Sequence, residues 1–184
     1  MDHTRQIREA LPEVEEITDP DARRRVVDTW AAVIAESPFD EITTVPWWPP
    51  YAEDVGEQTQ VDHVRDVTTC AIAIADELGA RRDLDLDRDL VVIGSLLHDI
   101  SKPLEMTATD VGERGKWLSH PHHAVHVLER DGWSLPVQHI ALAHSPRTGV
   151  EPQTIEAQIV TAADDLAAHA IFWENAGRLK DVVK

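Results

Sequence analysis

The residues of this chain best suited to chemistry are histidines on the apolar faces of expected helices. His63 shares a face with Val67 and Cys70, because residues three, four and seven apart point to the same side of a helix. His144 likewise extends an apolar stripe that contains Ile140. A single histidine in such a place is usually a core residue with an ordinary hydrogen-bond partner. Several of them on separate helices predict a common role.

Two aspartates occupy equally unusual positions. Asp164 continues a face formed by Val160 and Ala167, and the doublet His98-Asp99 closes the most apolar helix of the chain. An unpaired carboxylate is very costly to bury. A divalent cation removes that cost and accepts neutral imidazoles as further ligands. The pattern therefore predicts a metal centre between helices.

The adjacency of His98 and Asp99 adds a geometric condition. Neighbours on a helix point about 100° apart, so both can reach one ion only at the end of the helix. Pro103 places the doublet near such an end, and the small residues Gly94 and Ser95 let another group approach closely.

Taken in chain order, these residues resemble the HD-domain superfamily of metal-dependent phosphohydrolases. Its pattern is a histidine, a His-Asp doublet after a hydrophobic run, and a late aspartate that follows alanine. The matching stretches run from about Val61 to Ala168 and contain His63, Leu96-Leu97-His98-Asp99-Ile100-Ser101-Lys102 and Ile159-Val160-Thr161-Ala162-Ala163-Asp164. The resemblance implies one ion held by His63, His98, Asp99 and Asp164.

Two further positions resemble the branches of this superfamily that bind two ions. His120 opens an expected helix and His144 closes another. The resemblance implies that they hold a second ion together with a bridging Asp99. The expected cofactors are one or two divalent transition-metal ions, with Fe, Mn, Co, Ni and Zn all open.

Local alternatives exist for two of these ligands. Asp165 could replace Asp164, but its helical neighbours are more polar. His122 or His123 could replace His120, and the spacing does not separate them sharply.

The chemistry that the resemblance implies is hydrolysis of a small phosphorylated metabolite or nucleotide, as a phosphomonoesterase or phosphodiesterase. Two ions would activate water, neutralise phosphate oxygens and align the attack. Asp99 would fix their spacing. Lys102, one turn past the doublet, is a candidate phosphate ligand, or else a solvated lysine at a helix end. Arg147, just after His144, is a second candidate anion clamp.

Two rival functions share the same ligand set. Some members of the wider superfamily hold two irons with these residues and activate dioxygen instead of water. A metal-binding sensor without catalysis is a third hypothesis. The match at Lys102 favours hydrolysis.

The elements that must position these residues are helices, and no convincing pair of strands is present. The sequence predicts an all-α fold, a single HD-like bundle with an N-terminal helical extension. Expected caps are Asp19, Ser119, Ser134 and Thr154, and expected glycine ends are Gly79 and Gly177. The expected helices begin near residue 20 and cover about Gln58–Leu78, Arg88–Ile100, His120–Arg130, Leu135–His144 and 155 to Asn175.

Two regions follow from this pattern. Residues 1–50 form the helical extension and a Trp/Pro-rich loop, and residues 51–184 form the metal-binding domain. The segment from Pro46 to Tyr51 cannot be helical; it is either an ordered loop anchored by its aromatic residues or a lid over the site. Specificity is expected from Trp47, Trp48, Tyr51, the loop from Glu105 to Trp117 and the loop after His144.

Composition narrows the class of protein. The chain has 184 residues, 42% of them hydrophobic, and a formal net charge of −17. Such an acidic surface repels phosphate backbones, so a nucleic-acid scaffold is not expected, and no apolar run is long enough to cross a membrane. The single Cys70 fits a reducing cytoplasm. The expected partner is an anionic small molecule, and the first fifty residues could cover the site or form a homodimer surface.

Overall fold

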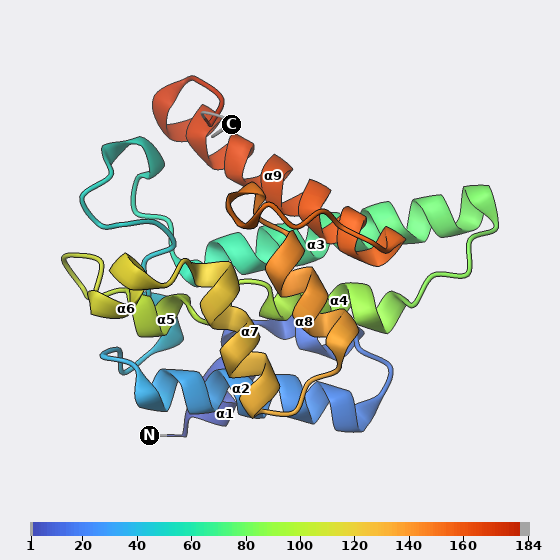
Figure 1. The fold of residues 1–184 in the computed structure, drawn as a ribbon, viewed down its shortest axis with the longest axis horizontal. Helices are drawn as coiled ribbons and strands as arrows, with labels where there is room; N and C mark the ends of the chain where they lie inside the picture. The colour runs from blue at the N-terminus through green and yellow to red at the C-terminus, as the bar shows by residue number, and fades with distance from the viewer. Residues whose placement is uncertain (1, 181–184) are drawn as a thin grey trace.

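The computed structural model describes residues 2–180 and confirms the all-α fold class (Figure 1). Within that range the only β pairing consists of isolated bridges between Pro46 and Thr59 and between Met106 and Val111. No described helix is long and apolar enough to span a membrane.

Three helices form the layer that carries most of the predicted ligands. They are α3 (Gln60–Arg82), α4 (Arg88–Leu97) and α9 (Ile155–Ala176), and α3 packs against both of the others. Gly94 of α4 allows a close approach, since a Cβ at that position would lie 2.6 Å from Cδ1 of Ile140. The buried residues shared by these helices and α8 are Val67, Ala71, Ala75, Val91, Ile140, Ala157, Ile159, Val160, Ala163 and Ala167.

A second layer, formed by α1 (His3–Ala10) and α2 (Pro20–Glu36), lies at the bottom of Figure 1. Its apolar side chains belong to the same buried cluster as residues of α4, α7 (His120–Arg130) and α8 (Leu135–Ala143). Trp30 of α2 is fully buried, and its indole N–H donates to the carbonyl of Leu96 at 3.0 Å. The first fifty residues thus support the ends of the helices that carry the site. The domain boundary at residue 50 stays a prediction.

Two of the four expected caps, Asp19 and Thr154, are confirmed, and α3 has a cap that the sequence analysis did not name. Asp19 caps α2, Thr154 caps α9, and Thr59 forms a capping box with Asp62 at the start of α3. The expected serine caps are wrong in detail, because Ser119 and Ser134 occupy the N-cap positions without a side-chain capping bond. Their helices instead begin with proline in the first turn, which fits that place without a backbone N–H.

Two helix ends were predicted wrongly. The helix that begins at Arg88 ends at Leu97 and not near Ile100, because His98 occupies its C-cap position. Gly79 does not end α3, which continues to Arg82 and stops where Asp83 adopts a left-handed conformation with φ 51°. Asp is one of the few non-glycine residues that tolerate this conformation. Gly177, in contrast, ends α9 with φ 64° as predicted. Residues 84–87, which alternate leucine and aspartate, have no regular structure, and Asp87 caps α4.

Short elements complete the fold around the site. They are the helices α5 (Lys102–Glu105) and α6 (Glu113–Trp117) and the 3-10 turns η1 (Pro12–Glu16), η2 (Ile42–Thr44), η3 (Glu53–Val55) and η4 (Pro146–Thr148). In Figure 1 the teal loop around η3 rises beside the red end of α9, and Val55 packs there with Ile171 and Phe172.

Candidate metal centre

The structure brings all six predicted ligand residues together, mostly at helix ends. His63 lies in the first turn of α3, and His120 is the first residue of α7. His98 follows α4 and His144 follows α8, each in the C-cap position. Because α4 ends at Leu97, immediately before the doublet, the side chains of His98 and Asp99 can both point toward the centre. Asp164 reaches the same point from the middle of α9.

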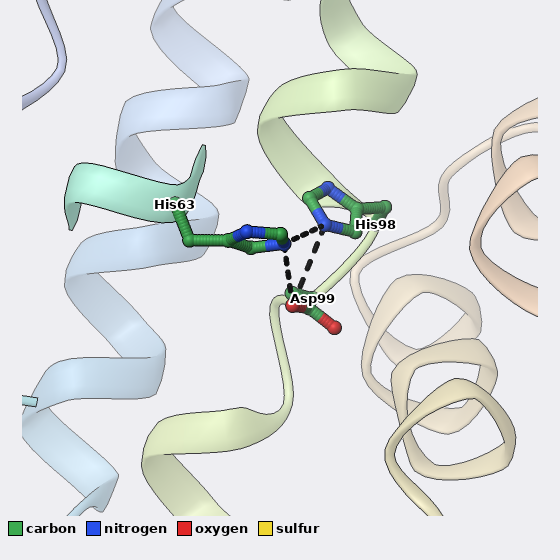
Figure 2. A group of neighbouring side chains, drawn as sticks. All are labelled: His63, His98 and Asp99. Carbon is green, nitrogen blue, oxygen red and sulfur yellow. Dashed lines mark hydrogen bonds and ion pairs between the residues drawn. The ribbon is translucent and has the colours of Figure 1, made fainter. Parts of the chain in front are cut away.

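The first group consists of His63, His98 and Asp99, whose side chains point toward one another in Figure 2. The two Nε2 atoms are 3.3 Å apart, and they lie 3.6 and 3.4 Å from Oδ2 of Asp99. Asp164 adds a fourth ligand atom, with Oδ1 3.0 Å from Nε2 of His63 and 3.7 Å from that of His98.

The second group consists of His120 and His144 around the other oxygen of Asp99. The Nε2 atoms of the two histidines are 3.2 Å apart. They lie 3.5 and 3.6 Å from Oδ1 of Asp99. Asp99 therefore stands between the two groups and faces each with a different oxygen.

These distances fit metal ions. Ligand atoms at about 2.1 Å from an ion are separated by about 3.0 to 3.4 Å in octahedral or tetrahedral arrangements. Oδ1 of Asp99 is buried and has no hydrogen-bond partner among the described residues. Burying an unpaired carboxylate oxygen beside two imidazoles is costly unless a cation completes the set. The residues present could thus hold a metal ion in each group.

The backbone orients two of the imidazoles. Nδ1 of His98 lies 2.6 Å from the carbonyl of Ser95, and Nδ1 of His144 lies 2.8 Å from that of Ala141. Because a carbonyl only accepts, each Nδ1 carries the hydrogen and each Nε2 presents its lone pair to the centre. Such outer hydrogen bonds fix the tautomer of metal-binding histidines.

His63 is oriented differently. Its ring stacks on the buried indole of Trp47, with centroids 4.4 Å apart and an angle of 25° between the planes. Nδ1 of His63 has no hydrogen-bond partner among the residues described. Trp47 therefore replaces the backbone as the feature that holds this ring.

Electrostatics favour the forms that metals bind at His63, His120 and Asp99. At His98 burial lowers the pKa, but the carboxylates of Asp99 and Asp164 outweigh it and raise that pKa overall. Burial lowers the pKa of His63 to about 4 against the opposing effect of Asp164. Burial also holds the pKa of His120 well below its usual value. Burial raises the pKa of Asp99, but Lys102, His98 and His120 outweigh it and keep that pKa well below its usual range. Neutral imidazoles and an ionised carboxylate are the states required of ligands.

Lys102 is part of the centre. Its Nζ lies 2.6 Å from Oδ2 of Asp99 and 5.2 Å from the ring centroid of Trp47, and the residue is only 5% exposed. A solvated helix-end lysine is therefore the wrong interpretation. Arg147 lies farther out, with its guanidinium carbon 5.6 Å from the ring centroid of Trp48.

The alternative ligands point elsewhere. Asp165 is exposed and lies 3.4 Å from His169. His122 is exposed and shares a 2.6 Å hydrogen bond with Ser119.

His123 is buried but pairs with Glu105 at 3.1 Å. Ser101 is also buried, and its hydroxyl lies 2.6 Å from the same carboxylate and 2.9 Å from the carbonyl of His120. This network, which the sequence did not predict, supports the backbone at His120. The only sequence signal for it is the position of His123 on the apolar face of α7.

A cavity of about 500 Å³ opens onto the centre, and Asp99, Lys102, His120, His144 and Asp164 all line it. Trp48 and the loop after His144 also line the cavity, as expected of specificity-determining regions. The other two expectations are not met: Tyr51 is 67% exposed, and neither it nor any described residue of 105–117 is among the lining residues.

Trp117 and Trp133 are not among the residues that line the cavity. The Trp133 indole N–H donates to Thr29 at 3.0 Å within the core, and Trp117 is 81% exposed.

Comparisons with known proteins agree with the predicted resemblance. The family model of the HD domain matches residues 61–169. A dihydroneopterin 2',3'-cyclic phosphate phosphodiesterase from Methanocaldococcus jannaschii is 31% identical over 110 residues, which cover 57% of this chain and 44% of that protein. The chain thus spans less than half of that relative's length.

Among solved structures, the HD domain of the L. monocytogenes phosphodiesterase PgpH aligns with a TM-score of 0.42 at 22% identity. That alignment covers 58% of this chain and 65% of the other.

Proposed function

Because this chain belongs to the HD domain family, we propose that its centre binds two divalent transition-metal ions and hydrolyses a small phosphate ester. The observation that carries the proposal is the placement of Asp99, whose two oxygens face separate groups of imidazoles. His63, His98, Asp99 and Asp164 would hold one ion. His120, His144 and Asp99 would hold the other.

When bound, the ions supply an activated water and neutralise phosphate oxygens. The protein supplies the rest. Asp99 fixes the spacing of the two groups, and the carbonyls of Ser95 and Ala141 keep two imidazoles in the required tautomer. Asp164 adds negative charge to one group only, which makes the two groups chemically unequal.

Lys102 is suited to bind the phosphate. Its ammonium is buried against Asp99 and lines the cavity, so it adds positive charge where an anionic substrate would lie. In a site shielded from water such a charge is worth more than on the surface. We propose that Lys102 donates to a phosphate oxygen while Asp99 is engaged by the metal ions.

The substrate class is a phosphodiester or phosphomonoester of metabolite size. A cavity of about 500 Å³ has the volume of sites that enclose small molecules. The relative named for a cyclic phosphate supports a phosphodiester. The single Cys70 supports a reducing, cytoplasmic location.

Hydrolysis by metal-loaded protein tests the proposal. The purified chain is stripped of metal, supplied with manganese, cobalt or nickel, and assayed with bis-p-nitrophenyl phosphate, cyclic nucleotides and phosphomonoesters. Turnover should depend on the metal and fall by about 100-fold in Lys102→Gln, as expected for the loss of one charged group that stabilises the transition state. Lys116→Gln, which changes an exposed lysine, is the matched control.

Failure of every metal and substrate to give turnover would contradict the proposal. Dioxygen uptake by an iron-loaded form would replace it with oxygenase chemistry.

A further inference from the structure

The cavity is larger than a phosphate group requires. Its inner end is formed by Asp99, Lys102, His120 and His144, most of them buried, and its outer part is lined by the half-buried Trp48, the exposed Arg147 and the segment that follows. A substrate whose phosphate lies at the inner end therefore leaves the outer part to its alcohol portion. The residues of that outer part determine which alcohol portions fit.

Trp48 is held as a fixed wall. Its ring centroid lies 5.2 Å from that of Trp47 at an angle of 46°, and 6.0 Å from that of Phe172 at 89°. Neither neighbour is stacked flat on the indole, so both fix its orientation by contact at an angle. Trp48 is only half-buried and lines the cavity.

The loop that carries Trp48 is fastened to the end of α9. Asp54 forms an ion pair with Arg178, and Val55 is buried in the same cluster as Phe172. Gly56 lies so close to Asn175 that a Cβ there would meet its Oδ1 at 2.4 Å. These contacts favour an ordered loop over a hinged lid, and an ordered loop presents the indole in one place.

Arg147 stands over the Trp48 ring but at a distance. Its guanidinium carbon is 5.6 Å from the ring centroid, whereas Arg25 lies 4.4 Å from the centroid of Trp133 in the core. The Arg25 pair is a closed cation–π contact, and the Arg147 pair is near the outer limit for one. Arg147 is exposed and sits on a short turn, so its flexible side chain can move outward to admit a flat group.

We propose that the space between Trp48 and Arg147 is a subsite for a flat, conjugated ring carried by the alcohol portion of the substrate. The ring stacks on the Trp48 indole, and the Arg147 guanidinium covers its other face. Stacking of this kind does not depend on the ring's hydrogen-bonding pattern, since every such ring has a π face. The subsite rests on the proposed function for its substrate, but its residues lie outside the ligand set.

Binding of two non-hydrolysable ligands to the metal-loaded protein tests the subsite without turnover. Adefovir carries adenine on a phosphonate chain whose P–C bond resists hydrolysis, and ethoxymethylphosphonate is the same molecule without the ring. Calorimetry should show adefovir binding at least about tenfold more tightly, because stacking one base is worth about that factor or more.

Substitutions identify the residues that cause the tighter binding of adefovir. Trp48→Ala should remove it, Trp48→Phe should retain most of it, and Trp117→Ala, which removes an exposed indole that does not line the cavity, should leave it unchanged. Arg147→Gln should weaken adefovir and leave ethoxymethylphosphonate within about twofold. Equal loss for both ligands would assign Arg147 to the phosphate and overturn its part in the subsite.

Failure of the proposed subsite can be distinguished from failure of the proposed hydrolysis. Equal affinity of the two ligands for the unaltered protein, no binding of either, or a ring preference that survives Trp48→Ala would overturn the subsite. A ring preference in a protein that hydrolyses nothing would leave the subsite in place and remove only the proposed hydrolysis.

Discussion

The two sides of α4 differ in the buried polar groups that lie against them. On the side that faces the N-terminal layer, the indole N–H of Trp30 donates to Leu96, and that of Trp133 donates to Thr29. On the side that faces the cavity, Oδ1 of Asp99 and Nδ1 of His63 are buried without a hydrogen-bond partner among residues 2–180. A single residue, Leu97, separates Leu96 from the doublet His98-Asp99.

This difference indicates which region of the protein requires bound cations. Native proteins leave few buried polar groups unpaired, so those that remain require an explanation. In the N-terminal layer Nδ1 of His3 is also buried without a hydrogen-bond partner, but neither group of potential metal ligands among the described residues includes it, so this layer should contribute mainly to stability. The centre needs cations, and changes there should act mainly on metal binding and turnover.

The largest effect is expected at Asp99. Because Asp99 belongs to both groups, Asp99→Ala should remove most of the bound metal and lower the rate of hydrolysis at least about a thousandfold. Metal analysis and the assay above measure both, and circular dichroism checks that the variant is folded. A variant that keeps its metal would break the distinction between the two sides.

A substitution at Trp30 should have the opposite effect to one at Asp99: it should lower stability and leave metal binding unchanged. Trp30→Ala should lower the free energy of unfolding by about 3–5 kcal/mol, because it empties a fully buried site. The metal-to-protein ratio of the folded variant should not change. Urea unfolding with a chelator present measures the first quantity. Loss of metal at unchanged stability would show that the layer does more than support the helices.

Trp47 combines features of both regions. It is a buried apolar residue, and it stacks on the predicted metal ligand His63. Trp47→Ala should weaken metal binding to the group that contains His63 by about 10- to 100-fold, the usual effect of removing an outer support. Binding to the group with His120 and His144 should be unchanged. Trp47→Phe should restore most of the affinity, because a phenyl ring also stacks on imidazole. Equal weakening of both groups would indicate general damage instead.

The smallest effect concerns Asp89, which ties α4 to the chain just before α2. Its carboxylate accepts hydrogen bonds from the backbone of Thr18 and Asp19 and from the Thr18 hydroxyl. Burial raises the pKa of Asp89, but these bonds outweigh it and lower that pKa overall.

A carboxylate with a lowered pKa in the folded state stabilises the protein above its unfolded pKa of about 3.9, and this stabilisation is lost as the pH falls through the folded value. Asp89→Asn should therefore destabilise at pH 7 by less than about 1 kcal/mol, since solvent screens this partly exposed group. The difference from the unaltered protein should shrink below pH 4. A difference that is constant with pH would mean that the carboxylate charge plays no part.

The sequence predicted the part of the centre that follows from helical periodicity. Asp164 and Asp165 are adjacent, yet their neighbours on the helix were enough to identify which of them points inward. The distinction between His120 and His123 was weaker, because both lie on the inward side of α7, and only the contact of His123 with Glu105 separates them. The fold class and the starts of α2 and α9 also follow from local pattern and from the predicted caps Asp19 and Thr154, whereas the Thr59 cap of α3 was not predicted.

The features that the sequence did not predict depend on contacts between distant segments. No local pattern indicates that Trp47 stacks on His63, or that Ser101 and Glu105 support His120. Glycine is common at helix ends, so the local pattern predicts an end at Gly79, but α3 packs on α4 and α9 and continues to Arg82. Contacts between segments that are distant in the sequence can be identified only from the three-dimensional structure.

The most direct test of the account is the number of metal ions bound at saturation, measured by native mass spectrometry. The unaltered chain should bind two divalent ions, and His63→Ala and His120→Ala should each bind one, because each removes a ligand from a different group. A chain that binds no transition metal would contradict the account, as would a ratio unchanged by either substitution.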